Sequence, residues 1–267
     1  EERHDEQEIP TARDRDFTGE SVSMGFLADI GSNTAFVTNV TLSHRAPSLG
    51  ELYNFGPHTG SLMFEVGNPE LDSETTVGLD VGLRHQDPKL KASFNAYRYS
   101  IGNFVFGSMT DRIVDGLRVA NFLQADSRFV GFEAEANRRL GGGVWLNAGL
   151  GFVDAELTTS QESLPRIAPF RGRLSLDVPY KSFTLSPEVI LAASQDQVYR
   201  TETATGGYSV INMRLSYVWA RATMVHIISA AGYNLTNKLY RNHTSFIKDL
   251  APEIGRGVRI GYSVRFF

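Results

Sequence analysis

Residues 256–267 read Arg-Gly-Val-Arg-Ile-Gly-Tyr-Ser-Val-Arg-Phe-Phe, and this stretch decides the fold class. Apolar or aromatic side chains stand at every second position: Val258, Ile260, Tyr262, Val264 and Phe266. Because successive side chains of a strand point to opposite faces, the other face carries Arg259, Gly261, Ser263 and Arg265. An apolar face that ends in a C-terminal aromatic residue is typical of a bacterial outer-membrane β-barrel strand. Phe267 lies one position beyond this pattern.

The composition of the whole chain is compatible with such a barrel. Hydrophobic residues make up 42% of the 267 residues, and no stretch approaches the roughly 20 apolar residues that a membrane-spanning helix needs. Transmembrane strands alternate apolar and polar residues, so their average composition resembles that of a soluble protein. The absence of cysteine excludes disulfides and thiolate metal sites, and the net charge of -4 does not indicate a nucleic-acid partner.

The same alternation recurs along the chain and predicts an all-β fold, an antiparallel up-and-down transmembrane β-barrel with about eleven strands in this chain. It is clearest in residues 170–178, where Arg171, Arg173 and Asp177 share a face that suits only a hydrated interior. Pro187 lies inside a predicted strand and indicates a bulge or a misplaced boundary, because proline cannot donate to the ladder. Besides these residues and the last strand, the predicted strands are residues 22–28, 36–44, 75–84, 90–96, 130–136, 144–152, 183–191, 211–219 and 225–235.

The connections between these strands are alternately short and long. Outer-membrane barrels have short periplasmic turns and long outer loops, so the short turns and the C-terminus are predicted to face the periplasm. The short turns are residues 31–33, 86–88, 141–143, 180–182 and about 220–221. The long loops are residues 46–72, 108–116, 157–169, 195–206 and 236–255.

Aromatic residues near the strand ends predict the two aromatic girdles of a transmembrane barrel. Phe183, Tyr217 and Trp219 fall near short turns, whereas Tyr208 and Tyr233 fall near long loops. His226 is predicted to project toward the lumen.

The strand count predicts that the chain is part of a larger barrel. The first and last predicted strands both run toward the short-turn side, and an odd-stranded sheet cannot close antiparallel on itself. Residues 1–18, rich in charge, are then expected to be part of an outer loop. No signal peptide is recognisable, so we expect a mature form or a piece of one.

Several motifs resemble TonB-dependent outer-membrane receptors. Residues 45–53 read Arg-Ala-Pro-Ser-Leu-Gly-Glu-Leu-Tyr and resemble the mid-barrel segment of that family, together with residues 56–58, 64–69 and 71–74. Residues 233–240, Tyr-Asn-Leu-Thr-Asn-Lys-Leu-Tyr, resemble its penultimate strand and loop. Residues 242–252, Asn-His-Thr-Ser-Phe-Ile-Lys-Asp-Leu-Ala-Pro, followed by Gly255 and Arg256, resemble the subgroup with zinc-uptake receptors.

The resemblance implies a barrel of about 22 strands around an N-terminal plug. Residues 1–267 match the C-terminal part of such a barrel, and the plug has no counterpart in this sequence. The implied protein is integral to the outer membrane, binds a small metal-containing ligand, and uses TonB-coupled energy transmitted through its plug. Its implied partners are the lipid bilayer, its own plug, the remaining strands and TonB. Zinc or haem would be cargo, and no cofactor is expected.

Charged residues on the polar faces are predicted to line the lumen and contact the plug. The candidates are Arg171, Arg173, Asp177, Arg214, Glu133 and Glu135. For each residue taken singly, the alternative is a solvated barrel lining.

The outer loops carry candidate ligands for a metal ion, because zinc binds imidazole nitrogen and carboxylate oxygen. These candidates are His4, His58, His243, Glu51, Glu65 and Asp249. No local spacing joins them, so only tertiary structure can bring them together. The alternative is that His58 and His243 cap turns or pack loop against loop.

No catalytic motif accompanies these features, so an enzyme is not expected. The glycine run 141–143 joins two strands and no helix follows it, which favours a hairpin turn over a phosphate site. Three kinds of function remain open. They are a receptor for a metal ion, haem or siderophore, a passive porin-like barrel, and a soluble all-β binding protein.

Overall fold

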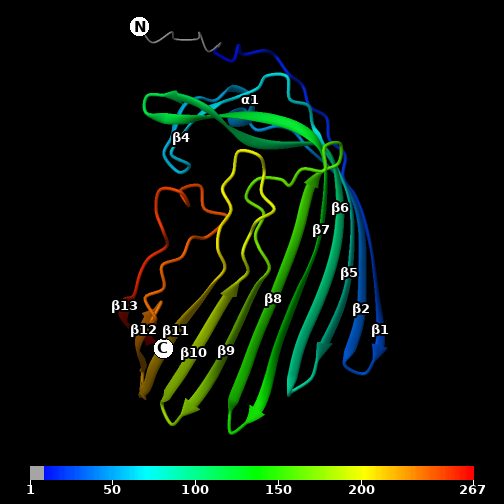
Figure 1. Ribbon diagram of the computed structural model, residues 1–267. Coiled ribbons are helices and arrows are strands. Elements are labelled where there is room, and N and C mark those ends of the chain that lie inside the picture. Colours follow the sequence, from blue (N-terminus) through cyan, green and yellow to red (C-terminus); the bar gives the residue numbers. More distant parts are fainter. Residues whose placement is uncertain (1–8) are drawn as a thin grey trace.

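The computed structural model describes residues 9–267, which form one sheet, antiparallel along its wall, with a single short helix (Figure 1). The sheet order is β1-β2-β5-β6-β7-β8-β9-β10-β11-β12-β13, which confirms the eleven successive wall strands predicted from the sequence. These strands are β1 (Val22–Gly31), β2 (Thr34–Arg45), β5 (Glu74–Gln86), β6 (Leu90–Val114), β7 (Leu117–Gly141), β8 (Val144–Leu157), β9 (Arg171–Tyr180), β10 (Phe183–Ala192), β11 (Tyr208–Arg221), β12 (Met224–Tyr233) and β13 (Gly257–Phe266).

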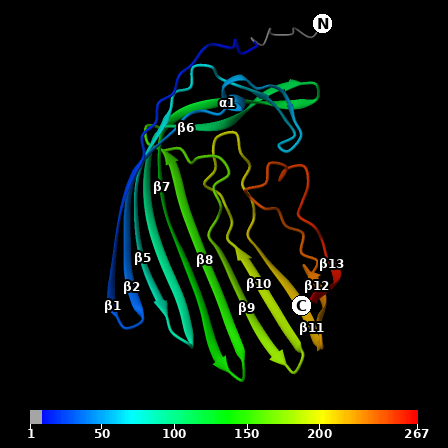
Figure 2. The same cartoon turned by 180° about the vertical axis from the view of Figure 1, so that it is seen from behind.

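The sheet curves into an open wall whose short turns gather at one end and whose long connections gather at the other (Figures 1 and 2). Within residues 9–267, β1 and β13 are the two ends of the strand order. No helix of these residues is long and apolar enough to cross a membrane.

The side chains of the wall divide into the two predicted faces. Residues Val77, Leu79, Val81 and Leu83 of β5 are between 36% and 53% exposed, although they are aliphatic. The register β2 to β5 pairs Val40 with Leu79, and Val40 is itself exposed. A continuous stripe of exposed aliphatic side chains is what a lipid-facing surface requires.

The predicted loop at residues 108–116 is wrong, because β6 and β7 continue through it as one long hairpin. Its turn is formed by Asp115 and Gly116, both at positive φ (51° and 76°), which suits a two-residue hairpin turn. A register shift between Ile101 and Phe104 marks the point where the hairpin leaves the wall. We call residues 104–125 the overhanging hairpin, because it extends across the loop end of the wall in Figure 1.

Part of the long connection 46–72 is also ordered into small elements that rest on this hairpin. They are α1 (Leu49–Tyr53), β3 (Phe55–His58) and β4 (Met63–Val66). The side chain of Ser48 accepts a hydrogen bond from the Glu51 backbone N–H, and the Glu51 carboxylate accepts one from the Ser48 N–H, which forms a capping box. The strand β4 pairs in parallel with β7, so this connection is fixed to the overhanging hairpin.

Pro187 produces neither of the expected irregularities. The strand β10 continues through it, and Pro187 pairs with Met213 of β11 in an unbroken register. On the other side, the ladder to β9 has no pairs at Ser186 and Pro187 but resumes in the same register at Glu188. The missing N–H is therefore accommodated by a local gap in the ladder.

Aromatic side chains cluster at the short-turn end, as the sequence predicts. The ring centroids of Phe183 and Tyr217 lie 4.6 Å apart, and those of Tyr217 and Trp219 lie 5.6 Å apart. The prediction for His226 is wrong, because His226 pairs with Trp219 and stacks on its ring at 4.5 Å, on the apolar face.

The aromatic side chains near the long loops do not form the expected second girdle. Tyr208 and Tyr233 occupy positions of the same parity as the lumen-facing residues of their strands, and Tyr208 packs against Tyr240 at 4.3 Å. An error of one position in a strand exchanges its two faces, which is why such assignments fail near strand ends.

Gly131 offers a test of the packing inside the wall. A Cβ atom at Gly131 would overlap the Tyr97 hydroxyl and the Phe152 carbonyl oxygen, whereas one at Gly149, on the next strand, meets nothing within 4 Å. We expect Gly131→Ala to destabilise the barrel by about 1–3 kcal/mol and Gly149→Ala to have little effect. Circular-dichroism melting of the full-length protein in detergent measures this, and equal melting of the two variants would contradict the packing described.

Candidate functional site

The predicted lumen residues do share one face of the wall. Glu133 and Glu135 of β7 line a hollow together with Arg171 and Arg173 of β9. A neighbouring hollow is lined by Arg173, Asp177 and Arg214. The structure therefore brings all six candidates to the same polar surface.

Some of these residues already have partners within the wall. Asp177 accepts hydrogen bonds from Asn147 Nδ2 at 2.9 Å and from Ser186 Oγ at 2.6 Å. Arg173 lies 3.6 Å from Glu188. This inter-strand network orients the polar face, and it is compatible with a hydrated lining as well as with a docking surface.

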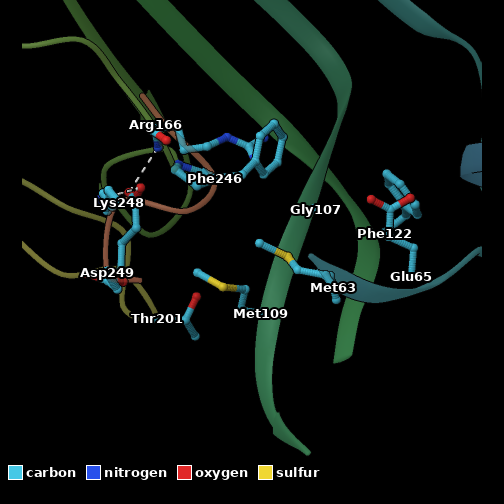
Figure 3. Close-up of a pocket in the computed structure, with 14 residues that line it drawn as sticks. Met63, Glu65, Gly107, Met109, Phe122, Arg166, Thr201, Phe246, Lys248 and Asp249 are labelled. Atoms are coloured by element: carbon cyan, nitrogen blue, oxygen red, sulfur yellow. Dashed lines mark hydrogen bonds and ion pairs between the residues drawn. The ribbon is translucent and has the colours of Figure 1, made fainter. Parts of the chain in front are cut away.

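A more enclosed site lies at the loop end, between the overhanging hairpin and three connections from the other half of the sheet (Figure 3). The cavity measures about 160 Å³. The lining residues are Met63, Glu65, Gly107, Met109, Ala120, Phe122, Pro165, Arg166, Thr201, Glu202, Ser245, Phe246, Lys248 and Asp249. They come from segments that are far apart in the sequence, so no local motif predicts this cavity.

Strand register explains which side chains the hairpin side presents to the cavity. Glu65 of β4 and Met109 of β6 both pair with Ala120 of β7, so these three residues share a face. The alternate residues Phe64 and Val119 point to the opposite face and are buried (5% and 0% exposed). The hairpin layer thus has an apolar packed face and a second face that looks into the cavity.

The loop side of the cavity is held together by a buried ionic cluster of Glu202, His243 and Lys248. The Lys248 ammonium donates to Glu202 Oε1 at 2.9 Å, and His243 Nε2 lies 3.7 Å from Glu202 Oε2. Thr205 Oγ1 lies 3.0 Å from the other ring nitrogen of His243. Glu202 also accepts a hydrogen bond from the backbone N–H of Arg166, at 2.9 Å. One carboxylate therefore joins the β8–β9, β10–β11 and β12–β13 connections.

The charge state of Glu202 follows from these contacts. Burial alone would raise the pKa of its carboxyl, but hydrogen bonds from His243, Lys248 and the Arg166 backbone outweigh burial and lower the pKa to about 2. Glu202 is therefore ionised at neutral pH. Removing this buried anion would leave the Lys248 ammonium without its partner, which is costly.

Arg166 occupies an unusual position beside the cluster. Its backbone is in the left-handed region, at φ 58°, and its guanidinium lies over the Phe246 ring at 3.8 Å from the centroid. Burial lowers the pKa of Arg166, and the charges of Glu202 and Glu65 oppose this effect. Figure 3 shows Arg166 alongside Phe246 at the edge of the cavity.

The predicted metal ligands are distributed over several places at this end. Glu65 and Asp249 line the same cavity, and His58 Nδ1 lies 3.5 Å from Glu65 Oε1. Glu51 caps α1 and pairs with Arg45 at 2.9 Å, and His243 is enclosed in the ionic cluster. His4 lies outside the described residues.

Within residues 9–267, no group of three or more His, Asp or Glu side chains is arranged to hold a metal ion. The cavity residues that sequence reasoning did not single out include Met63, Met109, Arg166, Glu202 and Lys248. Lys248 lies in residues 242–252, which resemble the zinc-uptake subgroup, but the other four belong to no recognisable motif. The available signal for the two methionines was the rarity of methionine, with five in the chain.

The ionic cluster predicts an acid-sensitive loop structure. Because the folded-state pKa of Glu202 lies below the ordinary value of 4.5, its stabilisation is complete above that pH and is lost as the pH falls toward 2. We expect Glu202→Gln to increase amide hydrogen exchange in residues 199–205 and 242–249 at neutral pH. In the unmodified protein, exchange in these residues should increase as the pH falls from about 5 to 2, the range set by the two pKa values, and the variant should lose this pH dependence.

The measurement uses the full-length protein, with exchange corrected for its intrinsic pH dependence. Asp196→Asn is the matched control, because Asp196 lies in the same connection but is exposed and accepts only a long hydrogen bond from Ser194, at 3.3 Å. Equal exchange in the two variants would show that the cluster does not hold the loops.

Comparison with known proteins identifies the fold. A family model described as TonB dependent receptor-like, beta-barrel, matches residues 7–235. The copper transporter OprC superposes with a TM-score of 0.78 at 21% sequence identity, covering 91% of this chain and 39% of that one. The ferric enterobactin receptor PfeA of Pseudomonas aeruginosa gives a TM-score of 0.66 at 16% identity, with 91% and 39% covered.

The siderophore receptor PirA of Acinetobacter baumannii gives a TM-score of 0.64 at 14% identity, with 92% of this chain and 40% of that chain covered. This chain therefore spans about two fifths of the length of the structures it matches. At these identities the superpositions establish the fold, and their names describe transporters and receptors, not enzymes. Since the family model covers most of the chain, this protein belongs to the TonB-dependent receptor β-barrel family and is an integral protein of the bacterial outer membrane.

Proposed function

We propose that the receptor of which this chain forms the C-terminal barrel part takes up a scarce metal ion, or a small metal complex, with energy delivered through TonB. The observation that carries the proposal is the enclosed cavity between the overhanging hairpin and the three connections of the loop end. Its position at the outer mouth suits capture of cargo before passage through the lumen. The proposal assigns transport to the receptor and no chemical reaction.

The size of the cavity favours a small cargo. Pockets for drug-sized ligands measure about 300–1,000 Å³. The cavity here measures about 160 Å³, which suits an ion with a few waters or one group of a larger complex. The likeness to a copper transporter supports a metal cargo. Zinc is a further candidate, for which His58 and Glu65, 3.5 Å apart, supply two of the residue types it prefers.

A siderophore or haem cargo is the second candidate, and one group of residues favours it. The Arg166 guanidinium stacks on Phe246, and both line the cavity with Phe122. A cation held against an aromatic ring suits an anionic aromatic chelate. Such a ligand would need the loops to open beyond the volume described.

The remaining parts of the receptor fit around this chain. The hollows lined by Glu133, Glu135, Arg171, Arg173, Asp177 and Arg214 are proposed to receive the plug. Residues 1–18 are proposed to belong to an outer loop, although residues 1–8 lie outside the described residues. Within them, Arg15 donates to the Leu71 carbonyl oxygen at 3.0 Å and pairs with Asp72, which supports a position at the loop end.

Uptake by intact cells tests the proposed function. We expect deletion of the full receptor gene to abolish accumulation of one metal or metal complex at limiting concentration, with zinc, copper, ferric siderophore and haem measured in parallel. Restoring the gene should restore accumulation only when TonB is present. Uptake that persists without TonB, or steady conductance of the purified receptor in bilayers, would instead indicate a passive pore.

The histidine hypothesis has its own test in the purified full-length receptor. If His58 and His243 bind zinc, replacing both by glutamine weakens zinc binding at least tenfold, measured by calorimetry. His85→Gln is the matched control, because His85 lies beside a short turn, where it contacts Thr34 and Asp87. Unchanged zinc affinity in the double variant would exclude these histidines as ligands.

A further inference from the structure

The methionines of this chain fall into two groups. Three of the five are on the apolar outer face of the wall: Met24 is exposed and pairs with Val40, Met213 is exposed, and Met224 pairs with Phe266. These three suit contact with lipid. The other two, Met63 and Met109, line the cavity at the loop end.

The pairing register of β4, β6 and β7 places Met63 and Met109 on the same face of the hairpin layer, although they belong to different strands. Met109 of β6 pairs with Ala120 of β7, and β4 runs along the other side of β7, where Met63 pairs with Arg118. The small side chain of Ala120 lies between the strands that carry the two methionines. Figure 3 shows both thioether side chains extending from the hairpin side toward the loops that carry Thr201 and Asp249.

Packing alone does not account for this arrangement. Methionine often fills irregular gaps in apolar cores, because its side chain is flexible. The opposite face of the hairpin layer buries Phe64 and Val119, and Met63 on the cavity face is also buried (7% exposed). Both methionines nevertheless line a cavity of about 160 Å³ and leave it unfilled.

The electrostatic surroundings are compatible with a cation of low charge. Thioether sulfur is neutral and soft, and soft sulfur ligands select Cu(I) among the biological metals. On the loop side, the Lys248 ammonium is neutralised by Glu202 at 2.9 Å. The Arg166 guanidinium is turned onto the Phe246 ring. Asp249 adds a carboxylate to the lining of the same cavity.

We infer that Met63 and Met109 form a binding site for a soft monovalent metal ion of the Cu(I) class at the outer mouth of the receptor. The two sulfurs supply the selective ligands, and Asp249 supplies compensating charge. The site discriminates against zinc, since it contributes no imidazole. The inference that the transported metal binds here during uptake rests on the proposed function, but metal binding by the two thioethers does not.

Binding of Ag(I), a redox-inert soft monovalent ion, to the purified full-length receptor tests the site. We expect the Met63→Leu/Met109→Leu double variant to bind Ag(I) at least tenfold more weakly than the unmodified receptor and to lose the corresponding sulfur scattering in X-ray absorption spectra. Leucine is close to methionine in volume, so packing is largely retained. Zinc affinity should not change.

Met213→Leu is the matched control, because it removes a thioether from the lipid-facing surface. Met109→Leu alone is the second variant if the double variant does not fold, and it should lose part of the Ag(I) affinity. Ag(I) affinity and sulfur scattering equal to those of the control would overturn the site. TonB-dependent uptake in cells tests the proposed function separately, so either idea can fail while the other stands.

Discussion

The whole structure depends on one constraint, which is that every backbone N–H and C=O group in a bilayer must be paired within the protein. Between neighbouring strands the wall satisfies most of these groups through antiparallel ladders, which run unbroken between β5 and β6 and between β10 and β11. Because side chains alternate along each strand, the same pairing fixes which residues meet lipid and which face the lumen. At Pro187 the ladder to β9 has a local gap, but the register of the two strands does not shift.

The loop end is not subject to this constraint, because water there can pair with backbone groups. The chain can therefore leave the wall. The overhanging hairpin continues the β6–β7 ladder beyond a register shift and carries β4 with it. The opposite side is held by the Glu202, His243 and Lys248 cluster, which is buried although it is charged. A sheet layer and a set of ion-linked loops thus enclose one small cavity, and movement of either side would change its volume.

Much of the wall could be predicted because its signal is local. The alternation in residues 75–84 and 170–178 specified both the strands and their faces, and the short turns specified their direction. Predictions failed where the signal was not periodic. The Asp115–Gly116 turn is a strong hairpin signal, but it lies inside a segment that was predicted to be a loop. His226 was predicted on the wrong face, because a strand assignment that is wrong by one position exchanges the two faces.

The candidate site was predictable only in part, for a physical reason. Glu65 and Asp249 were recognised by residue type, but Met63, Met109, Arg166, Glu202 and Lys248 come from β4, β6 and three connections that are far apart in the sequence, and they share no spacing. By itself the sequence determined an outer-membrane barrel strand pattern, because alternation is a property of neighbours along the chain. Only the tertiary structure decided which loop residues meet, because the register of distant strands and one buried carboxylate bring them together.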